Sequence, residues 1–304
     1  MDMLLTIDIG NTSTSFCVFK SASRCDGGGR GERSTTSTAM ATCDDANPVG
    51  ASLTGSVMPF TGEVAQEQKD DEIVQCFDLA SDPGKSADEY GILISNLLKN
   101  FGFEGKISDC AISSVVPALD EIYGAALQKY LNLTPFWINH KVRIPFEIAI
   151  EGAKELGADR IANAARAVEN YKLPAIIIDF GTATTFDIID ENKRFIGGLI
   201  APGLKLQAQS LAKFTSKLPK LKIEAAKDSI GRNTVNAMLS GIVLGHCAFV
   251  SGMIKKCEKE LGQTATIVAC GGFSEELYDK IERKFDFIDK DLTHKGIRLV
   301  WKLN

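Results

Sequence analysis

One pattern occurs twice in the chain: Leu4-Leu5-Thr6-Ile7-Asp8-Ile9-Gly10-Asn11-Thr12-Ser13, and later Ala175-Ile176-Ile177-Ile178-Asp179-Phe180-Gly181-Thr182-Ala183-Thr184. In each copy an apolar run typical of a buried strand ends in Asp, and Gly follows two positions later. Glycine lets the backbone N–H groups of a tight turn approach phosphate oxygens, the Asp can serve a hydrated cation, and the hydroxyls add donors. The repetition predicts a duplicated phosphate-binding hairpin, and two ordinary hairpins are the alternative.

The size and composition are those of a globular protein with two compact lobes. The chain has 304 residues, of which 44% are hydrophobic and 24% charged. A net charge of −5 and a pI near 5.4 provide no basic stripe, so we expect no nucleic acid as main partner. No apolar run predicts a membrane span and no leader precedes the first strand, so we expect a cytoplasmic protein without a membrane partner.

The cysteines do not form a recognisable metal or redox motif. There are eight, without a C-x-x-C pair, and only three histidines accompany them. We therefore expect no structural zinc, and thiols that act as small buried hydrophobes or exposed bystanders in a reducing compartment.

The amino-acid composition changes after the first hairpin. Residues 21–70 are rich in Gly, Ser, Thr and Ala and lack apolar periodicity, which predicts a flexible insertion at the hairpin tip. A partner-binding role for this insertion is the alternative. Residues 73–79 then predict a third strand that pairs with the second strand, 16–19, across the insertion.

Strands and helices alternate along the rest of the chain. Ser86 and Glu89 form a capping-box pattern before a predicted helix that ends near Gly102. The other predicted helices cover about 119–130, 156–170, 203–214, 234–261 and 274–284, and the other predicted strands 110–116, 135–138, 185–189 and 265–270. This order predicts an α/β protein with two similar lobes, and Pro174 marks the expected boundary between residues 1–173 and 174–304.

The two hairpin turns are the first candidate site. If the lobes face each other across a cleft, both turns can contact the polyphosphate of a nucleotide from opposite sides, with a divalent cation near Asp8. No G-x-x-x-x-G-K-[ST] sequence is present, which excludes the P-loop route to phosphate binding. The candidate ATP-binding residues of the turns are Asp8, Gly10, Asn11, Thr12, Gly181, Thr182 and Thr184, and Asp179 is a second candidate metal ligand.

A second candidate is Gly157-Ala158-Asp159-Arg160, at the start of a predicted helix. An Asp in the first helical turn is expected from the helix dipole alone, and the Arg beside it can be a solvated charge. The position before the second hairpin places both near the cleft. There Asp159 can act as a general base and Arg160 can bind a carboxylate.

Two further segments carry candidate residues. Gly271 and Gly272 join a strand to a helix, and their bare backbone can admit an adenine ring and ribose; a tight structural turn is the equal alternative. Thr234 opens the most apolar helix of the chain, whose apolar residues cover more than one face. That helix indicates burial against a second subunit, with an internal core helix as the alternative.

Taken together, these motifs resemble those of the type III pantothenate kinases, a branch of the acetate and sugar kinase, heat-shock chaperone and actin superfamily. The matching motifs are Asp8-Ile9-Gly10-Asn11-Thr12, Ser113-Ser114-Val115-Val116-Pro117, Gly157-Ala158-Asp159-Arg160, Asp179-Phe180-Gly181-Thr182-Ala183-Thr184-Thr185, Gly197-Gly198-x-Ile200-x-Pro202-Gly203, Lys217-Leu218-Pro219, Gly231-Arg232-Asn233-Thr234 and Cys270-Gly271-Gly272. The resemblance implies two lobes of the actin-like ATPase (ribonuclease H-like) fold with a nucleotide cleft between them.

The resemblance also implies an activity, which is ATP-dependent phosphorylation of pantothenate to 4′-phosphopantothenate, the first step of coenzyme A biosynthesis. It implies a homodimer that uses ATP, Mg²⁺ and a monovalent cation, K⁺ or NH₄⁺. By this resemblance Asp159 is the general base, Gly157, Ala158 and Arg160 bind pantothenate, and Thr234 reaches it from the neighbouring subunit. Asp8 would hold Mg²⁺ through water, and Asp179 would lie near the monovalent cation.

Two departures from the family pattern and two alternative functions accompany this interpretation. The insertion at 21–70 replaces a short hairpin, and the segment 150–155 lacks the Pro usual before Gly-x-Asp-Arg. A kinase of the same superfamily with another acceptor is one alternative. A nonenzymatic transcriptional accessory protein is the other, and it is disfavoured because Asp8, Asp159 and Asp179 are all present.

Overall fold

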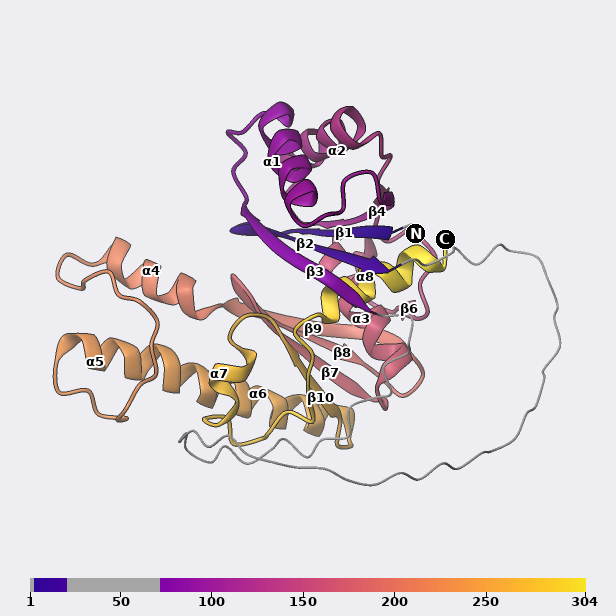
Figure 1. The fold of residues 1–304 in the computed structure, drawn as a ribbon. Helices are drawn as coiled ribbons and strands as arrows, with labels where there is room; N and C mark the ends of the chain where they lie inside the picture. The colour runs from indigo at the N-terminus through magenta and orange to yellow at the C-terminus, as the bar shows by residue number, and fades with distance from the viewer. Residues whose placement is uncertain (1–2, 21–71) are drawn as a thin grey trace, which may run out of the picture.

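The computed structural model describes residues 3–20 and 72–304, which form two mixed β-sheets with helices packed on them (Figure 1). The first sheet has the order β3-β2-β1-β4-β5. Its strands are β1 (Met3–Ile9), β2 (Ser13–Lys20), β3 (Ile73–Ala80), β4 (Ile107–Ser114) and β5 (Phe136–Trp137). The predicted pairing of the third strand with the second is confirmed, and the predicted insertion at 21–70 lies outside the described residues.

Two helices cover one face of the first sheet, α1 (Ala87–Asn100) and α2 (Pro117–Leu131). The predicted capping box starts α1: Ser86 N donates to Glu89 Oε2 at 2.8 Å and Glu89 N donates to Ser86 Oγ at 3.3 Å. Alternate residues of β1, among them Leu5 and Ile7, point to these helices and are fully buried. The opposite face of β1 therefore carries Thr6 and Asp8.

The second sheet repeats the plan of the first. Its order is β11-β10-β7-β8-β9-β6, so three antiparallel strands are followed by two parallel ones in both sheets, and β6 is added at one edge. The strands are β6 (Glu147–Ile148), β7 (Ala175–Phe180), β8 (Ala183–Ile189), β9 (Arg194–Pro202), β10 (Thr266–Cys270) and β11 (Phe287–Ile288). The predicted duplication of the hairpin thus extends to the sheets as a whole.

The helices of the second sheet follow expectation except for the last one, whereas β6, β9 and β11 were not among the predicted strands. The described elements are α4 (Leu204–Phe214), α5 (Thr234–Leu239), a π-helical turn (Ser240–Leu244), α6 (Gly245–Leu261) and α7 (Ser274–Tyr278). The predicted helix at 274–284 is wrong in length, because the chain after Tyr278 bonds to other elements. Glu282 N donates to Ser251 Oγ of α6 at 3.0 Å, and Asp286 N donates to the Ile267 carbonyl of β10 at 2.9 Å.

The continuous helix from Thr234 to Leu261 is, by length and composition, apolar enough to cross a membrane, contrary to the expectation of no such segment. In its most apolar window 56% is buried inside the protein. Ile242, Val250 and Ile254 pack in the core of the second sheet. These contacts are those of a core helix, one of the alternatives drawn from the sequence.

Two helices lie against both sheets, α3 (Ala158–Asn170) and α8 (Leu292–Lys302). One core contains Leu4 of the first sheet, Ile177 of the second and Trp301 of α8. The two helices approach so closely that a Cβ on Gly296 would lie 2.0 Å from the Ala162 carbonyl oxygen. Although α8 follows Pro174 in sequence, it packs on β1 and β4, and β6, which precedes Pro174, pairs with β9.

The cysteines correct one expectation. Cys17 and Cys76 face each other in the β2–β3 pair, with Cα atoms 4.2 Å apart, and form a disulfide. The expectation of thiols that act as small buried hydrophobes or exposed bystanders was therefore wrong for this pair, because strand register, not sequence spacing, brings them together. Cys110, Cys247, Cys257 and Cys270 are free and buried, as expected. Cys25 and Cys43 lie outside the described residues.

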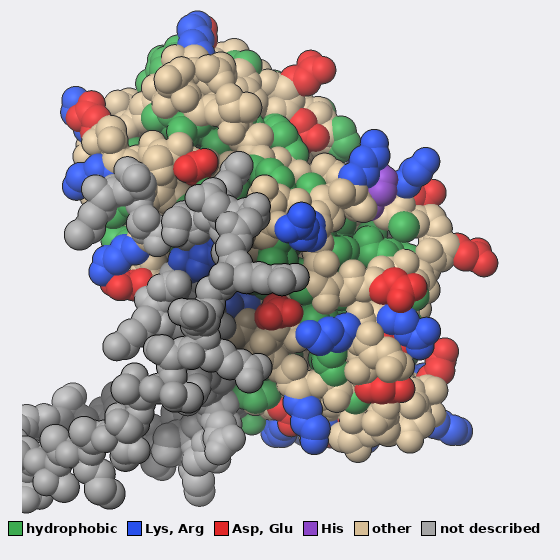
Figure 2. All heavy atoms as spheres, turned by 90° about the vertical axis from the view of Figure 1, so that its right-hand side faces the viewer, with side chains coloured by type: hydrophobic (Ala, Val, Ile, Leu, Met, Phe, Trp, Pro, Cys, Tyr) green, Lys and Arg blue, Asp and Glu red, His purple; other side chains and the backbone are tan. Residues whose placement is uncertain are grey.

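Charged side chains of both signs are interspersed on the described part of the face shown in Figure 2. No continuous basic stripe is seen among the described side chains of that face.

Candidate active site

The two predicted phosphate turns meet. Gly10 N donates to Ser13 O and Gly181 N to Ala183 O, each at 3.1 Å, so each turn is closed by the N–H of its glycine, with the acceptor three residues ahead in the first turn and two in the second. The hydroxyl oxygen of Thr12 lies 3.0 Å from that of Thr182. Asn11, Thr12, Gly181 and Thr182 are exposed, so their polar groups are accessible to a ligand.

Thr184 points elsewhere. It is fully buried, and its hydroxyl lies 3.0 Å from Nε2 of His246 on α6. Gln207 of α4 donates to Nδ1 of the same ring at 3.0 Å, and burial lowers the pKa of His246. The side chain therefore connects β8 to two helices, and its assignment to ATP stays a prediction. His246 was not predicted, although a histidine in an apolar helix is a usable signal.

Three carboxylates share one electrostatic environment. Burial raises the pKa of Asp8 to about 7, with further increases from the charges of Asp159 and Asp179 and an opposing effect of Ser113 on β4. Burial, with the Asp159 charge, raises the pKa of Asp179 to about 6. Burial also raises the pKa of Asp159. The structure thus brings together the three acids that the sequence singled out, from β1, α3 and β7.

The donor set of Asp8 fits a hydrated divalent cation. Its Oδ1 is buried without a hydrogen-bond partner, which is costly unless a cation or a proton occupies the position. Among the described residues, no three His, Cys, Asp or Glu side chains are placed to hold one ion together. The unpartnered Oδ1 of Asp8 suits Mg²⁺, which keeps several waters and takes few protein ligands.

The first turn of α3 presents Asp159 and Arg160. Asp159 Oδ1 accepts a 2.7 Å hydrogen bond from the backbone N–H of Arg160, and the helix dipole favours the acid there. A cavity of about 520 Å³ lies beside this turn; Gly157, Ala158, Trp137 and Lys154 contribute to its lining. The segment that lacks the family Pro is a short 3₁₀ turn, Ala153–Glu155, at the rim of that cavity.

Arg160 has a partner that was not predicted. Its Nε donates to Asp187 Oδ1 on β8 at 2.6 Å, and its guanidinium lies 5.5 Å from the centre of the Phe195 ring. Burial raises the pKa of Asp187 to about 7, against the opposing effect of Arg160, and the charges of Asp159 and Asp179 add to the increase. A carboxylate between apolar neighbours in a buried strand, Phe186 and Ile188, was the signal in the sequence.

Asn163, one turn beyond Asp159 on α3, was also missed. It is buried, accepts a 2.8 Å hydrogen bond from Thr293 Oγ1 and lowers the pKa of Asp179. It thereby connects the first turn of α8 to the second phosphate turn.

The glycine turn after β10 lies beside the second hairpin. Gly271 has φ +82°, and a Cβ there would lie 2.5 Å from Asp179 Oδ1 and 2.7 Å from Phe180 N. Glycine is therefore required by both conformation and space. Gly272 lines a cavity of about 460 Å³ together with Lys205 and Phe273, and this cavity has the size for a base and ribose.

Thr234 is not brought to the carboxylates by its own chain. It is exposed at the start of α5 and lines a different cavity of about 640 Å³, with Leu211, Leu218 and Ile242. Figure 1 shows α5 at the outer end of the second sheet's helices, away from α3.

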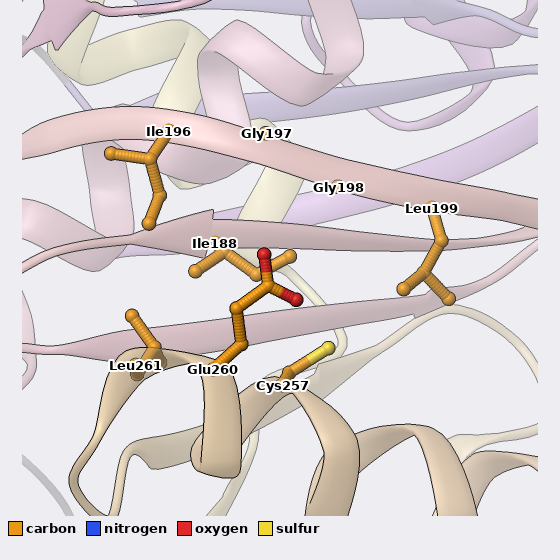
Figure 3. A pocket seen from close by; sticks show the side chains of 8 residues that line it. All are labelled: Ile188, Ile196, Gly197, Gly198, Leu199, Cys257, Glu260 and Leu261. Carbon is orange, nitrogen blue, oxygen red and sulfur yellow. The ribbon is translucent and has the colours of Figure 1, made fainter.

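A further pocket of about 310 Å³ is separate from these residues. Figure 3 shows it between β8, β9 and α6, with the Glu260 carboxylate directed toward the strands. Arg160 lies on the α3 side of the same strands, whereas this pocket lies on the α6 side. None of the predicted site residues lines it.

The family model for type III pantothenate kinases matches residues 61–256. This chain belongs to the type III pantothenate kinase family. A type III pantothenate kinase from Dehalococcoides mccartyi is 37% identical over 235 residues, which cover 77% of this chain and 89% of that protein. Another from Halalkalibacterium halodurans is 36% identical over 245 residues, covering 80% and 96%.

Among solved structures, a putative Baf family transcriptional activator from Campylobacter jejuni matches this family member with a TM-score of 0.52. The match covers 98% of this chain and 97% of that one. Because the two sequences are only 18% identical, it is evidence for the fold alone. With the duplicated sheets, it confirms the predicted α/β class and the actin-like ATPase fold.

Proposed function

We propose that the chain transfers the γ-phosphoryl group of ATP to the primary hydroxyl of pantothenate, giving 4′-phosphopantothenate, the first step of coenzyme A biosynthesis. The observation that carries this proposal is the meeting of the two turns at Thr12 and Thr182 beside three carboxylates. Membership of the type III pantothenate kinase family supports the choice of acceptor.

On the ATP side, the chain's role is positioning. The turns at Gly10 and Gly181 offer backbone N–H groups, and the Thr12 and Thr182 hydroxyls add donors for phosphate oxygens. Asp8 would hold Mg²⁺ through water, and when bound this ion neutralises charge on the phosphates. The cavity beside Gly272 receives the base and ribose. The cleft lies between lobes that we place at residues 1–173 and 174–304.

On the acceptor side, Asp159 takes the proton of the hydroxyl. Its raised pKa makes the ionised form a stronger base than an exposed carboxylate, and a positioned base contributes roughly 10² to 10⁴ in rate. Arg160 pairs with the acceptor's carboxylate, and Gly157 and Ala158 line the cavity that receives the rest of the molecule. Asp179, beside Gly271, serves the monovalent cation, K⁺ or NH₄⁺.

The functional unit that we propose is a cytoplasmic homodimer. Exposed apolar side chains gather on α4 and around the start of α5: Leu206 is 40% exposed, Phe214 78%, Ile230 81% and Val235 42%. Exposed apolar groups of this size favour association. A second copy covering them would bring its Thr234 to the acceptor.

Turnover with several acceptors tests the proposal. ADP release is measured with Mg²⁺ and K⁺ in the presence of pantothenate, pantetheine or simple sugars. We expect pantothenate to give the strongest stimulation. Stimulation by another acceptor alone would assign a different kinase activity, and no stimulation by any acceptor would leave a regulatory role.

A further inference from the structure

We propose that Asp187 is a positioning residue that holds the Arg160 guanidinium so that its outer edge faces the carboxylate of the acceptor. This inference rests on the proposed function, because it concerns recognition of that acceptor.

The contact places Asp187 at the inner edge of the guanidinium. Asp187 lies on β8, is 0% exposed, and accepts from Nε of Arg160 at 2.6 Å. Nη2 of Arg160 reaches the Phe186 carbonyl at 3.4 Å. A guanidinium has five N–H donors, and these contacts use two of them. The Arg160 side chain is 17% exposed, so the other donors can meet a ligand from solvent.

The neighbouring strand leaves room for this arrangement. Gly198 of β9 is paired with Asp187, and a Cβ at Gly198 would lie 2.5 Å from Arg160 Nη2 and 2.0 Å from the Phe186 carbonyl oxygen. The Phe195 ring, on the same strand, lies 5.5 Å from the guanidinium. Asp187, the bare backbone of Gly198 and an aromatic face therefore fix Arg160 on three sides, which accounts for the glycine at position 198.

Stability alone does not explain a carboxylate here. Oδ2 of Asp187 is buried without a hydrogen-bond partner, and desolvation of a buried ion pair commonly offsets the attraction within it. A planar Arg held at Nε, by contrast, presents its two terminal nitrogens in the fork geometry that a carboxylate accepts. The geometry thus accounts for Asp187 as a determinant of acceptor orientation.

Steady-state kinetics with two acceptors test the inference. The first acceptor is pantothenate, and the second is its alcohol analogue, in which a hydroxymethyl group replaces the carboxylate. We expect Asp187→Ala to raise KM for pantothenate about tenfold or more, because a displaced Arg160 loses its charge-assisted contact with the acceptor carboxylate. KM for ATP should stay unchanged. For the alcohol analogue we expect the same KM in the variant and the wild type. Asp187→Asn, whose amide oxygen still accepts from Nε, should restore KM for pantothenate to within about threefold.

Asp190→Ala is the matched control. Asp190 is buried on the same hairpin and pairs with Arg194 at 2.6 Å, but neither residue belongs to the site, so both acceptors should be unaffected. The inference would be overturned if Asp187→Ala raised KM equally for both acceptors, or if Asp187→Asn did not restore KM for pantothenate. Either result would leave the kinase activity of the wild type established. A wild-type protein that phosphorylates neither acceptor would overturn the proposed function and this inference with it. If Asp187→Ala does not fold, Asp187→Ser takes its place. KM for pantothenate in Asp187→Asn is then compared with that of Asp187→Ser.

Discussion

The hydroxyl oxygens of Thr12 and Thr182 lie 3.0 Å apart although 170 positions separate the residues. Each belongs to the turn of one copy of the repeated hairpin, so the contact joins the two halves of the duplication. Because the turns meet through hydroxyls, the point of contact consists of donors that a phosphate can take over. This contact is the basis of the nucleotide site proposed here.

Thr12→Val should weaken ATP binding. The variant keeps the shape of the side chain but removes its hydroxyl, and one hydrogen bond corresponds to roughly a 3- to 10-fold increase in KM for ATP. Thr12→Ser should restore the wild-type value. Thr134→Val, at an exposed position outside the site, is the control. An unchanged KM for ATP in Thr12→Val would argue against phosphate contact by this turn.

Asp159→Asn should fold and bind ATP but lose phosphoryl transfer. An amide cannot take the hydroxyl proton, so kcat should fall by about 10² to 10⁴. Circular dichroism and nucleotide titration verify folding and binding, and single-turnover kinetics measure transfer. Near-normal turnover in this variant would remove Asp159 from the mechanism.

Gly271→Ala should destabilise the protein, whereas Gly272→Ala should not. A side chain at Gly271 meets Asp179 and the Phe180 backbone at φ +82°, while nothing lies within 4 Å of a Cβ at Gly272. Non-glycine residues in such backbone regions cost of order 1–3 kcal/mol, and the close contacts add to this. Urea denaturation of the two variants measures the difference. Equal unfolding free energies would mean that the turn relaxes readily.

His294 should make stability depend on pH. The ring lies between the hydroxyls of Thr6, at 2.8 Å, and Ser15, at 2.9 Å, and burial lowers its pKa to about 4. The unfolded chain takes up a proton near pH 6.5, so stability is lost as pH falls from about 6.5 to about 4. At pH 5 this loss amounts to about 2 kcal/mol.

The test compares the wild type with His294→Gln, which cannot titrate in this range. The wild type should be the more stable protein at pH 7.5, and its advantage should shrink by about that amount at pH 5. Unfolding free energies that run parallel across the range would contradict the assignment.

The double variant Phe214→Lys and Val235→Lys should be monomeric. Both side chains are exposed on the apolar surface of α4 and α5, and charges there oppose burial against a second copy. Turnover should fall with dissociation, because Thr234 of the neighbouring subunit would be withdrawn. Ile92→Lys, 50% exposed on α1, is the matched control and should remain dimeric and active. Sedimentation velocity measures the state, and an active wild-type monomer would refute the dimer.

Much of the fold could be predicted because the relevant signals are local. The apolar runs before Asp8 and Asp179 define buried strands, and the residues that follow define turns. Repetition of one local pattern then indicated that the turns are equivalent. The capping box at Ser86 and the span of α4 are likewise set by neighbouring residues.

The remaining features depend on pairs far apart in sequence. The contact of Arg160 with Asp187 spans 27 positions and requires the orientation of α3 on the second sheet. The disulfide of Cys17 and Cys76 requires the register of two strands separated by 59 positions. The shortness of α7 follows from contacts with α6 and β10 that its own sequence does not contain. Such features need the three-dimensional arrangement before they can be recognised.

The position of α8 has a consequence for biosynthesis. β1 and β2 are translated well before α8, which is one of the two helices that cover the inner face of their sheet. Until residues 292–302 emerge, Leu4 and its neighbours have α3 but not α8 on that side, so this core is completed long after β1 has been translated. A ribosome stalled shortly before this segment would hold an incomplete lobe, open to chaperones and proteases.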